Sequence, residues 1–177
     1  MGFIKKINLI VFLGALFSYA SLQCQEEVVW TPDFRFSWND FKGSVPKSSS
    51  AAATTASGIS YDFSTFYDKK KLKIDYNVYA YFYPLKSWYK PQLCNDITLQ
   101  HEQLHFDITE LYARKLRKQL TEATFSKNVK EEVRKMYKAI LRQLNDFQNK
   151  YDSETNYSRN LPVQERWVLE IEEALNQ

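Results

Sequence analysis

Apolar and polar residues alternate in Leu72-Lys73-Ile74-Asp75-Tyr76-Asn77-Val78-Tyr79-Ala80. A period of two is typical of a strand with one buried face, and we expect this strand to span residues 71–83. A second long strand is predicted over residues 55–66, and Asp68-Lys69-Lys70-Lys71 between the two predicts a hairpin turn. Shorter aromatic runs predict strands at 28–30 and 35–41. A loop with Gly43, Pro46 and serines 48–50 follows them.

The pattern becomes helical from residue 95 onward. Asn95 or Asp96 is a suitable N-cap for a helix that runs to about Thr121. Asn128 and Glu131 match a capping box at the start of a second helix. Its apolar residues recur three and four apart, at Val129, Val133, Met136, Ile140, Leu144 and Phe147. A polar loop is expected over residues 152–160. Pro162 then suits the first turn of a last helix, whose apolar face carries Trp167, Val168, Ile171 and Leu175.

Strands in the first half and helices in the second predict an α+β fold. We expect a small antiparallel β-sheet in the N-terminal half, packed on a C-terminal set of about three helices. A length of 177 residues, with 44% hydrophobic and 25% charged residues, suits one globular domain, which we place at residues 25–177. Loss of residues 1–20 removes two of the 24 basic residues and none of the 21 acidic ones, which leaves a net charge of +1. Such a chain lacks the positive surface of a nucleic-acid-binding protein.

The N-terminal residues resemble a secretory leader. Lys5 and Lys6 precede an apolar run over residues 9–17, and Ser18-Tyr19-Ala20 has small residues where a signal peptidase cuts. We therefore assign residues 1–24 to a signal peptide and a short mature stub, and expect an exported protein, periplasmic or secreted. The mature chain has no expected transmembrane span. The alternatives are an uncleaved anchor and a lipoprotein attached through Cys24, although Gln23 fits a lipobox poorly.

The candidate site is His101-Glu102-Gln103-Leu104-His105, which contains both histidines of the chain. Residues four apart on a helix project from nearly the same face, so the two imidazoles can bind one Zn²⁺. In the HExxH motif of metalloproteases the glutamate lies beside the metal's water and acts as general base. The pattern therefore predicts zinc as cofactor, His101 and His105 as ligands, and Glu102 as the catalytic residue. The alternative is two histidines and a solvated glutamate on an ordinary helix.

A catalytic zinc also needs a third protein ligand. Asp107 points away from the histidine face, and Tyr112 is better suited to core packing. With no other histidine, the ligand must be an aspartate, glutamate, cysteine or tyrosine. The polar segment 151–158 is the best source, because the chain can return there beside the first helix. Asp152, Glu154 and Tyr157 are the candidates in it.

Several segments together resemble the bacterial family called domain of unknown function 922, described as secreted zinc-dependent proteases. The shared segments are Trp38-Asn39-Asp40-Phe41-Lys42-Gly43, residues 52–59, Ser87-Trp88, residues 101–108 with Glu110 and Ala113-Arg114, Tyr151-Asp152 with Thr155, and Gln164 with Trp167. The resemblance implies a zincin-like metalloprotease domain. It also implies a histidine two residues after the threonine, and here that residue is Tyr157. A tyrosine can ligate zinc as a phenolate, since a bound metal lowers its pKa.

Two functions follow as expectations. The first is an exported zinc-dependent hydrolase, most simply a metallopeptidase that cleaves peptides or proteins in the cell envelope or outside it, with a strand edge within residues 55–83 to hold an extended peptide. The second, motivated by Tyr157, is a non-catalytic envelope-binding protein with a degenerate zinc site on the same fold. A structural zinc site ranks last, because it needs four closed ligands and the chain offers no obvious fourth.

Overall fold

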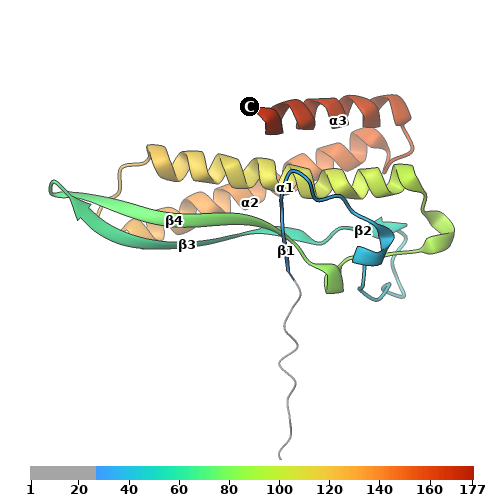
Figure 1. The fold of residues 1–177 in the computed structure, drawn as a ribbon, viewed down its shortest axis with the longest axis horizontal. Coiled ribbons are helices and arrows are strands. Elements are labelled where there is room, and N and C mark those ends of the chain that lie inside the picture. The colour runs from blue at the N-terminus through green and yellow to red at the C-terminus, as the bar shows by residue number, and fades with distance from the viewer. Residues whose placement is uncertain (1–26) are drawn as a thin grey trace, which may run out of the picture.

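The computed structural model describes residues 27–177, so the predicted leader and Cys24 lie outside the described residues. The elements follow the order β1 Val28–Val29, η1 Trp38–Asp40, β2 Ala53–Thr54, β3 Ser57–Asp68, β4 Lys71–Phe82, η2 Pro84–Lys86, β5 Trp88–Tyr89, η3 Pro91–Leu93, α1 Asp96–Glu122, α2 Val129–Thr155 and α3 Leu161–Asn176. Strands precede helices, and the predicted α+β class with three C-terminal helices is confirmed (Figure 1). Within residues 27–177, none of the helices is long and apolar enough to cross a bilayer.

A long antiparallel hairpin forms the main sheet. β3 and β4 pair from Ser57↔Phe82 to Asp68↔Lys71, and β1 pairs with the other edge of β4. The predicted alternation is confirmed near the base of β4, where Val78 and Ala80 are buried and Tyr79 is exposed. A separate two-stranded sheet pairs β2 with β5. Both sheets are antiparallel, as expected.

Residues 35–41 were expected to form a strand, and that prediction is wrong. The backbone turns at η1, where the Ser37 N–H donates to Asp40 Oδ2 at 2.7 Å and the Asp40 N–H donates to the Ser37 carbonyl at 3.0 Å. Phe36 and Phe41 on either side pack against Phe82 instead of pairing in a sheet. The aromatic residues of segment 35–41 are therefore a sign of burial in the core and not of strand pairing.

The helices begin close to where they were predicted. The Asn95 side chain accepts from the Thr98 N–H at 3.0 Å and caps α1, which ends at Glu122. Asn128 is the N-cap of α2 but makes no side-chain cap bond, so the capping box predicted with Glu131 is absent. Glu131 pairs with Arg134 instead. α3 has Pro162 in its first turn, as predicted.

The second helix is longer than predicted. α2 continues through Asp152 to Thr155, where a loop was expected. Tyr151 and Thr155 in this last turn are fully buried, and the Thr155 hydroxyl donates to the Tyr151 carbonyl at 2.7 Å. Burial of these two residues keeps the turn helical despite its polar sequence. The chain then reverses through three left-handed residues, 156–158.

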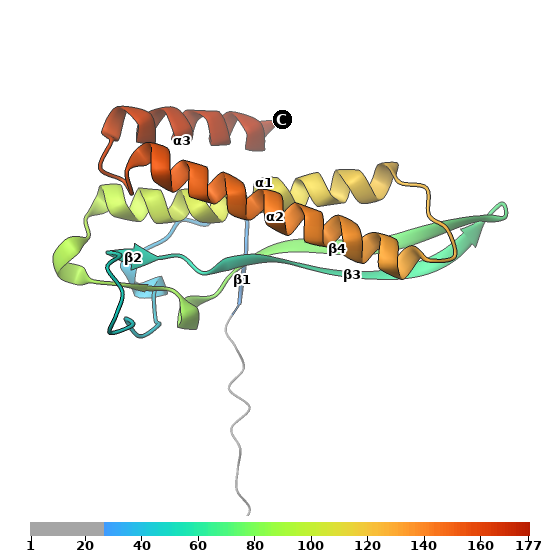
Figure 2. The same ribbon diagram turned by 180° about the vertical axis from the view of Figure 1, so that it is seen from behind.

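α1 is the central element. It contacts β3 and β4 on one side and α2 and α3 on the others. Figures 1 and 2 show α1 and α2 lying along the hairpin, with α3 on the side of these helices away from it. The largest fully buried side chains of the core include Trp167, Tyr151, Phe82 and Phe106. This packing brings the first half of α1 against the last turn of α2.

Candidate metal centre

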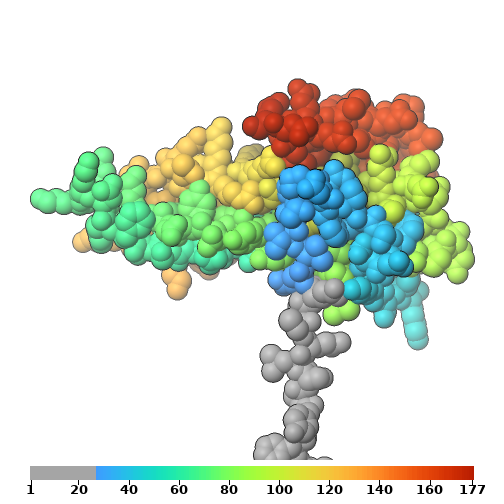
Figure 3. Space-filling view, viewed as in Figure 1, coloured from blue at the N-terminus to red at the C-terminus, as the bar shows by residue number. Residues whose placement is uncertain are grey.

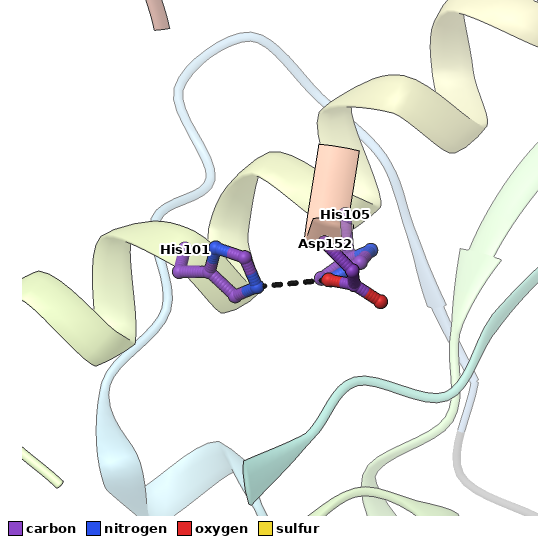
Figure 4. A group of neighbouring side chains, drawn as sticks. All are labelled: His101, His105 and Asp152. Carbon is purple, nitrogen blue, oxygen red and sulfur yellow. Dashed lines mark hydrogen bonds and ion pairs between the residues drawn. The ribbon is translucent and has the colours of Figure 1, made fainter. Parts of the chain in front are cut away.

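Three side chains from two helices meet at one point. His101 and His105 project from the same face of α1, and Asp152 reaches them from the last turn of α2 (Figure 4). The Asp152 Oδ1 atom lies 3.0 Å from His101 Nε2 and 2.9 Å from His105 Nε2. One potential ligand atom from each residue lies within 4.8 Å of the others.

These three atoms suit one divalent ion. In a tetrahedral zinc site with bonds of about 2.0–2.1 Å, ligand atoms lie roughly 3.3 Å apart. The distances from the shared carboxylate oxygen to the two nitrogens, 2.9 and 3.0 Å, are close to that spacing. Two imidazoles and a carboxylate are a common protein donor set for catalytic zinc. The residues present therefore fit the predicted cofactor.

The charges at this point are strongly coupled. Burial opposes ionisation of Asp152, but hydrogen bonds from His101 and His105 outweigh it and hold the pKa of the carboxyl well below its usual range. Burial lowers the pKa of His105, yet the hydrogen bond to Asp152 and the charge of Glu102 raise it, and the net shift is upward. The site therefore places one anionic carboxylate next to two imidazole rings. This arrangement favours the binding of a cation.

The His101 ring is held from its other side. His101 Nδ1 lies 3.0 Å from Gln164 Oε1, and this oxygen also accepts from the Tyr151 hydroxyl at 2.9 Å. An amide oxygen only accepts, so Nδ1 is the donor in that contact, and Nε2 is the atom that faces Asp152 and would be free to bind a metal ion. The Tyr151 ring stacks on the His101 ring, with centroids 4.5 Å apart. Such outer contacts orient a histidine for metal binding.

Glu102 lies beside the histidines in a cavity. It is 5% exposed, and its Oε2 atom is buried with no hydrogen-bond partner among residues 27–177. The cavity has a volume of about 580 Å³ and is lined by Glu102, His101, His105, Asp152 and the segment 50–55. A buried carboxylate oxygen without a partner is costly unless a ligand or water meets it. Glu102 therefore faces a space in which another group can bind.

The other predicted ligands, Tyr157 and Glu154, make different contacts. Tyr157 also lines the cavity, but it is 61% exposed and is not one of the three converging residues. Glu154 accepts from Trp167 Nε1 and from Arg166, each at 2.9 Å. Asp107 faces away from the histidines, as expected, and accepts from Trp30 Nε1 at 2.7 Å. Of the two carboxylates predicted in segment 151–158, the structure brings Asp152 and not Glu154 to the histidines.

Several supporting residues could not be identified by spacing. Gln164 and Tyr151 stood out only through the family resemblance, without a role. Gln148 donates to the His105 carbonyl at 3.1 Å, and Thr55 donates to the Glu102 carbonyl at 3.1 Å. These contacts join segments far apart in the chain, and no local sequence signal marks them.

Comparison with known proteins gives a match to a family model. The model of a family described as "Bacterial protein of unknown function (DUF922)" matches residues 92–159. This segment spans α1 and α2 and includes all three converging residues and Glu102. Neither the curated proteins nor the solved structures contain a match.

Proposed function

We propose, from the match of residues 92–159 to the DUF922 family model and from the metal-centre geometry, that this protein is a metal-dependent hydrolase of peptide bonds. His101, His105 and Asp152 would hold a zinc ion, and Glu102 would act as general base. The observation that carries the proposal is the convergence of three ligand atoms beside the unpartnered carboxylate oxygen of Glu102. We also propose that the protein is exported, as its first 20 residues indicate.

Each residue has a distinct task in this proposal. A bound ion supplies Lewis acidity, which acidifies a water molecule and polarises a carbonyl. Three protein ligands leave a position open for those groups. Asp152 contributes one negative charge, and Gln164 keeps the His101 Nε2 lone pair available through its bond to Nδ1.

Glu102 would take a proton from the attacking water and pass it to the leaving amine. Its carboxylate is well placed because its backbone is fixed: the Thr55 hydroxyl donates to the Glu102 carbonyl at 3.1 Å. Gln148 fixes the next turn of α1 through the His105 carbonyl. General bases gain effectiveness when their position is held by neighbouring contacts.

A polypeptide substrate fits the surroundings of the cavity. The segment 50–55, which includes β2, lines it with small side chains and a strand backbone. Such a backbone can pair with an extended peptide. We therefore propose β2, next to the histidines, as the peptide-binding edge, in place of the strand edge within residues 55–83 that the sequence analysis expected.

A second candidate is a non-catalytic binding protein on the same fold. The observation that favours it is Tyr157, which stands where the family resemblance implies a histidine and is largely exposed. In that case the metal site would be weak, and the cavity would bind a ligand without turnover.

Metal binding and turnover test the proposal. Residues 27–177, which contain every described element, would be purified without metal and titrated with Zn²⁺, with elemental mass spectrometry as readout. We expect one zinc per chain, and loss of it in His101→Ala and Asp152→Asn. Hydrolysis would be followed with a peptide library. Glu102→Gln should keep zinc and lose on the order of 10²–10⁴-fold in rate.

The outcomes separate the two candidates. Tight zinc with undiminished activity in Glu102→Gln would refute the general base. No zinc above the His101→Ala background would refute the hydrolase and favour the binding protein. Tyr157→Phe is the matched control, since it removes a potential oxygen ligand from the same cavity and should change neither metal content nor rate.

A further inference from the structure

The β3–β4 hairpin extends past the helices that pack on it. The Tyr76 hydroxyl donates to the Arg117 carbonyl at 2.9 Å and contacts Thr121, next to the end of α1. The strands continue beyond this level to the turn at residues 69–70, and all residues from 64 to 71 are exposed. Figures 1 and 2 show the hairpin projecting beyond α1 and α2, and Figure 3 shows it as a narrow extension of the molecule. We call residues 66–73 the tip.

Positive charge is concentrated at the tip. It contains four lysines and one aspartate, Asp68, for a net charge of +3. The lysines are Lys69, Lys70, Lys71 and Lys73; all four are exposed, and none forms an ion pair with another described residue. Residues 21–177 carry a net charge of only +1, so the rest of that segment sums to −2. The tip is therefore a local cationic end on an otherwise slightly acidic body.

Two large aromatic side chains accompany the lysines. Phe66 is 48% exposed and Tyr67 is 70% exposed. Neighbouring residues of a strand point to opposite faces, so each face of the tip presents one ring. Isolated exposed aromatics are common, but a pair at the end of a projecting hairpin has no core to join.

The turn keeps its lysines at a conformational cost. Lys69 has φ 46° and Lys70 has φ 68°, and both form the two-residue loop between β3 and β4. Positive φ at both loop positions is characteristic of the type I′ turn, which favours Asn-Gly. Lysine is unfavourable in this left-handed backbone conformation, because its Cβ is too close to the following carbonyl oxygen. Local strain that persists in a structure is a reason to look for a function of the side chains.

We propose that the tip is a docking site for a lipid bilayer with anionic headgroups. Aromatic rings partition to the interface between headgroups and acyl chains, and lysines beside them are attracted to anionic lipids. The narrow tip offers both features within eight residues and reaches past the folded body. The candidate metal centre lies in the first half of α1, and the tip lies beyond the other end of that helix. Docking through the tip therefore leaves the cavity open to the solvent.

A bilayer fits these observations better than a nucleic acid. Binding to a phosphate polymer needs a basic stripe that follows its backbone, and within residues 21–177 acidic residues outnumber basic ones outside the tip. A bilayer needs only one point of contact that joins apolar and cationic groups.

Vesicle sedimentation tests the proposal. Residues 27–177 would be mixed with vesicles of phosphatidylcholine alone and with vesicles that also contain phosphatidylglycerol. We expect binding to the anionic vesicles only, and weaker binding at high salt. Each lysine near an anionic surface contributes about fivefold in affinity, so Lys69→Gln with Lys70→Gln should weaken binding by about 25-fold. Phe66→Ser with Tyr67→Ser should also weaken it.

Two controls exclude misfolding and bulk charge. Lys69→Asn with Lys70→Gly installs the preferred turn sequence, so it should raise the midpoint of thermal unfolding while it weakens lipid binding. Lys47→Gln with Lys86→Gln removes the same charge from two exposed positions away from the tip and should leave lipid binding unchanged. Equal binding of the tip variants and the parent chain to anionic vesicles would overturn the proposal. So would tip-dependent binding to duplex DNA without binding to vesicles.

Discussion

Gln164 is the residue on which the orientation of His101 depends. Its Oε1 atom holds His101 Nδ1 at 3.0 Å, and the side chain is 1% exposed. Gln164→Leu has similar volume but no acceptor, so the His101 ring loses the contact that selects its tautomer. We expect zinc affinity to fall about 10–100-fold, measured by competition with a chelating dye. The absorption spectrum of the Co²⁺-loaded protein should change as well, because the ligand geometry loosens.

The matched variant for this test is Gln164→Glu. A carboxylate also accepts from His101 Nδ1, so zinc affinity should stay within a few-fold of the parent protein. A lower thermal midpoint in both variants, with equal zinc affinity, would show that Gln164 serves packing alone. The Tyr151 hydroxyl, which donates to the same oxygen, retains its acceptor in the glutamate variant.

Cys94 is a residue whose reactivity the structure predicts. Burial raises the pKa of its thiol, and the hydrogen bond to the backbone of Lys90 only partly offsets this. The thiol also donates to the Ala52 carbonyl at 3.3 Å. A raised thiol pKa means a smaller thiolate fraction at any pH below it, and the thiolate is the nucleophile. We expect alkylation by iodoacetamide at pH 8 to be slower than for free cysteine, and to speed up as pH rises. A faster rate than free cysteine would contradict this.

The reversal after α2 is the element that separates Asp152 from Tyr157. Asn156, Tyr157 and Ser158 all have positive φ, and Tyr157 has φ 53°. A tyrosine in this conformation costs roughly 1–2 kcal/mol, part of which a glycine recovers. Tyr157→Gly should therefore raise the free energy of unfolding by about 0.5–1 kcal/mol, measured in urea. Zinc affinity should not change, because the proposed ligands are His101, His105 and Asp152 and the Tyr157 side chain is largely exposed.

Tyr157→Ala is the control for that measurement. It removes the same ring but keeps the strained backbone, so it should bring no gain in stability. A fall of more than tenfold in zinc affinity in both variants would make the tyrosine a ligand and contradict the placement of Asp152.

Elements with a strong local signal were predictable from the sequence. The alternation in residues 72–80 located β4, and the Asn95 cap located the start of α1 and with it the pair His101 and His105. The last turn of α2 was not predictable, since its residues are polar and its helicity depends on burial of Tyr151 and Thr155 between helices. Which of Asp152, Glu154 and Tyr157 lies near the histidines depends on that same turn. The sequence narrowed the third ligand to segment 151–158, and the packing of α2 on α1 brings Asp152 next to the two histidines.

At the scale of the whole molecule, the candidate site joins elements distant in the chain. His101 and His105 lie on α1, Asp152 on α2, and Gln164 on α3. The segment that carries β2 closes the cavity from the N-terminal half. The geometry of the candidate site therefore depends on the packing of all three helices. A metal ion bound by His101, His105 and Asp152 would in turn hold α1 and α2 together.

Zinc should consequently stabilise the entire fold. A ligand at 100 times its dissociation constant adds about 2.7 kcal/mol to the free energy of unfolding, if it binds only the folded state. For a domain of this size that corresponds to a rise of about 5–10 °C in the thermal midpoint. Differential scanning calorimetry with and without zinc would measure this rise.

Glu102→Gln should show the full rise in the thermal midpoint, because the proposal gives Glu102 no part in holding the ion. Asp152→Asn should show little or none, since it keeps the size of the side chain but removes the charge. An equal rise in the Asp152→Asn variant would mean that zinc stabilises the protein at some other place, and the joining of α1 to α2 through this site would be wrong.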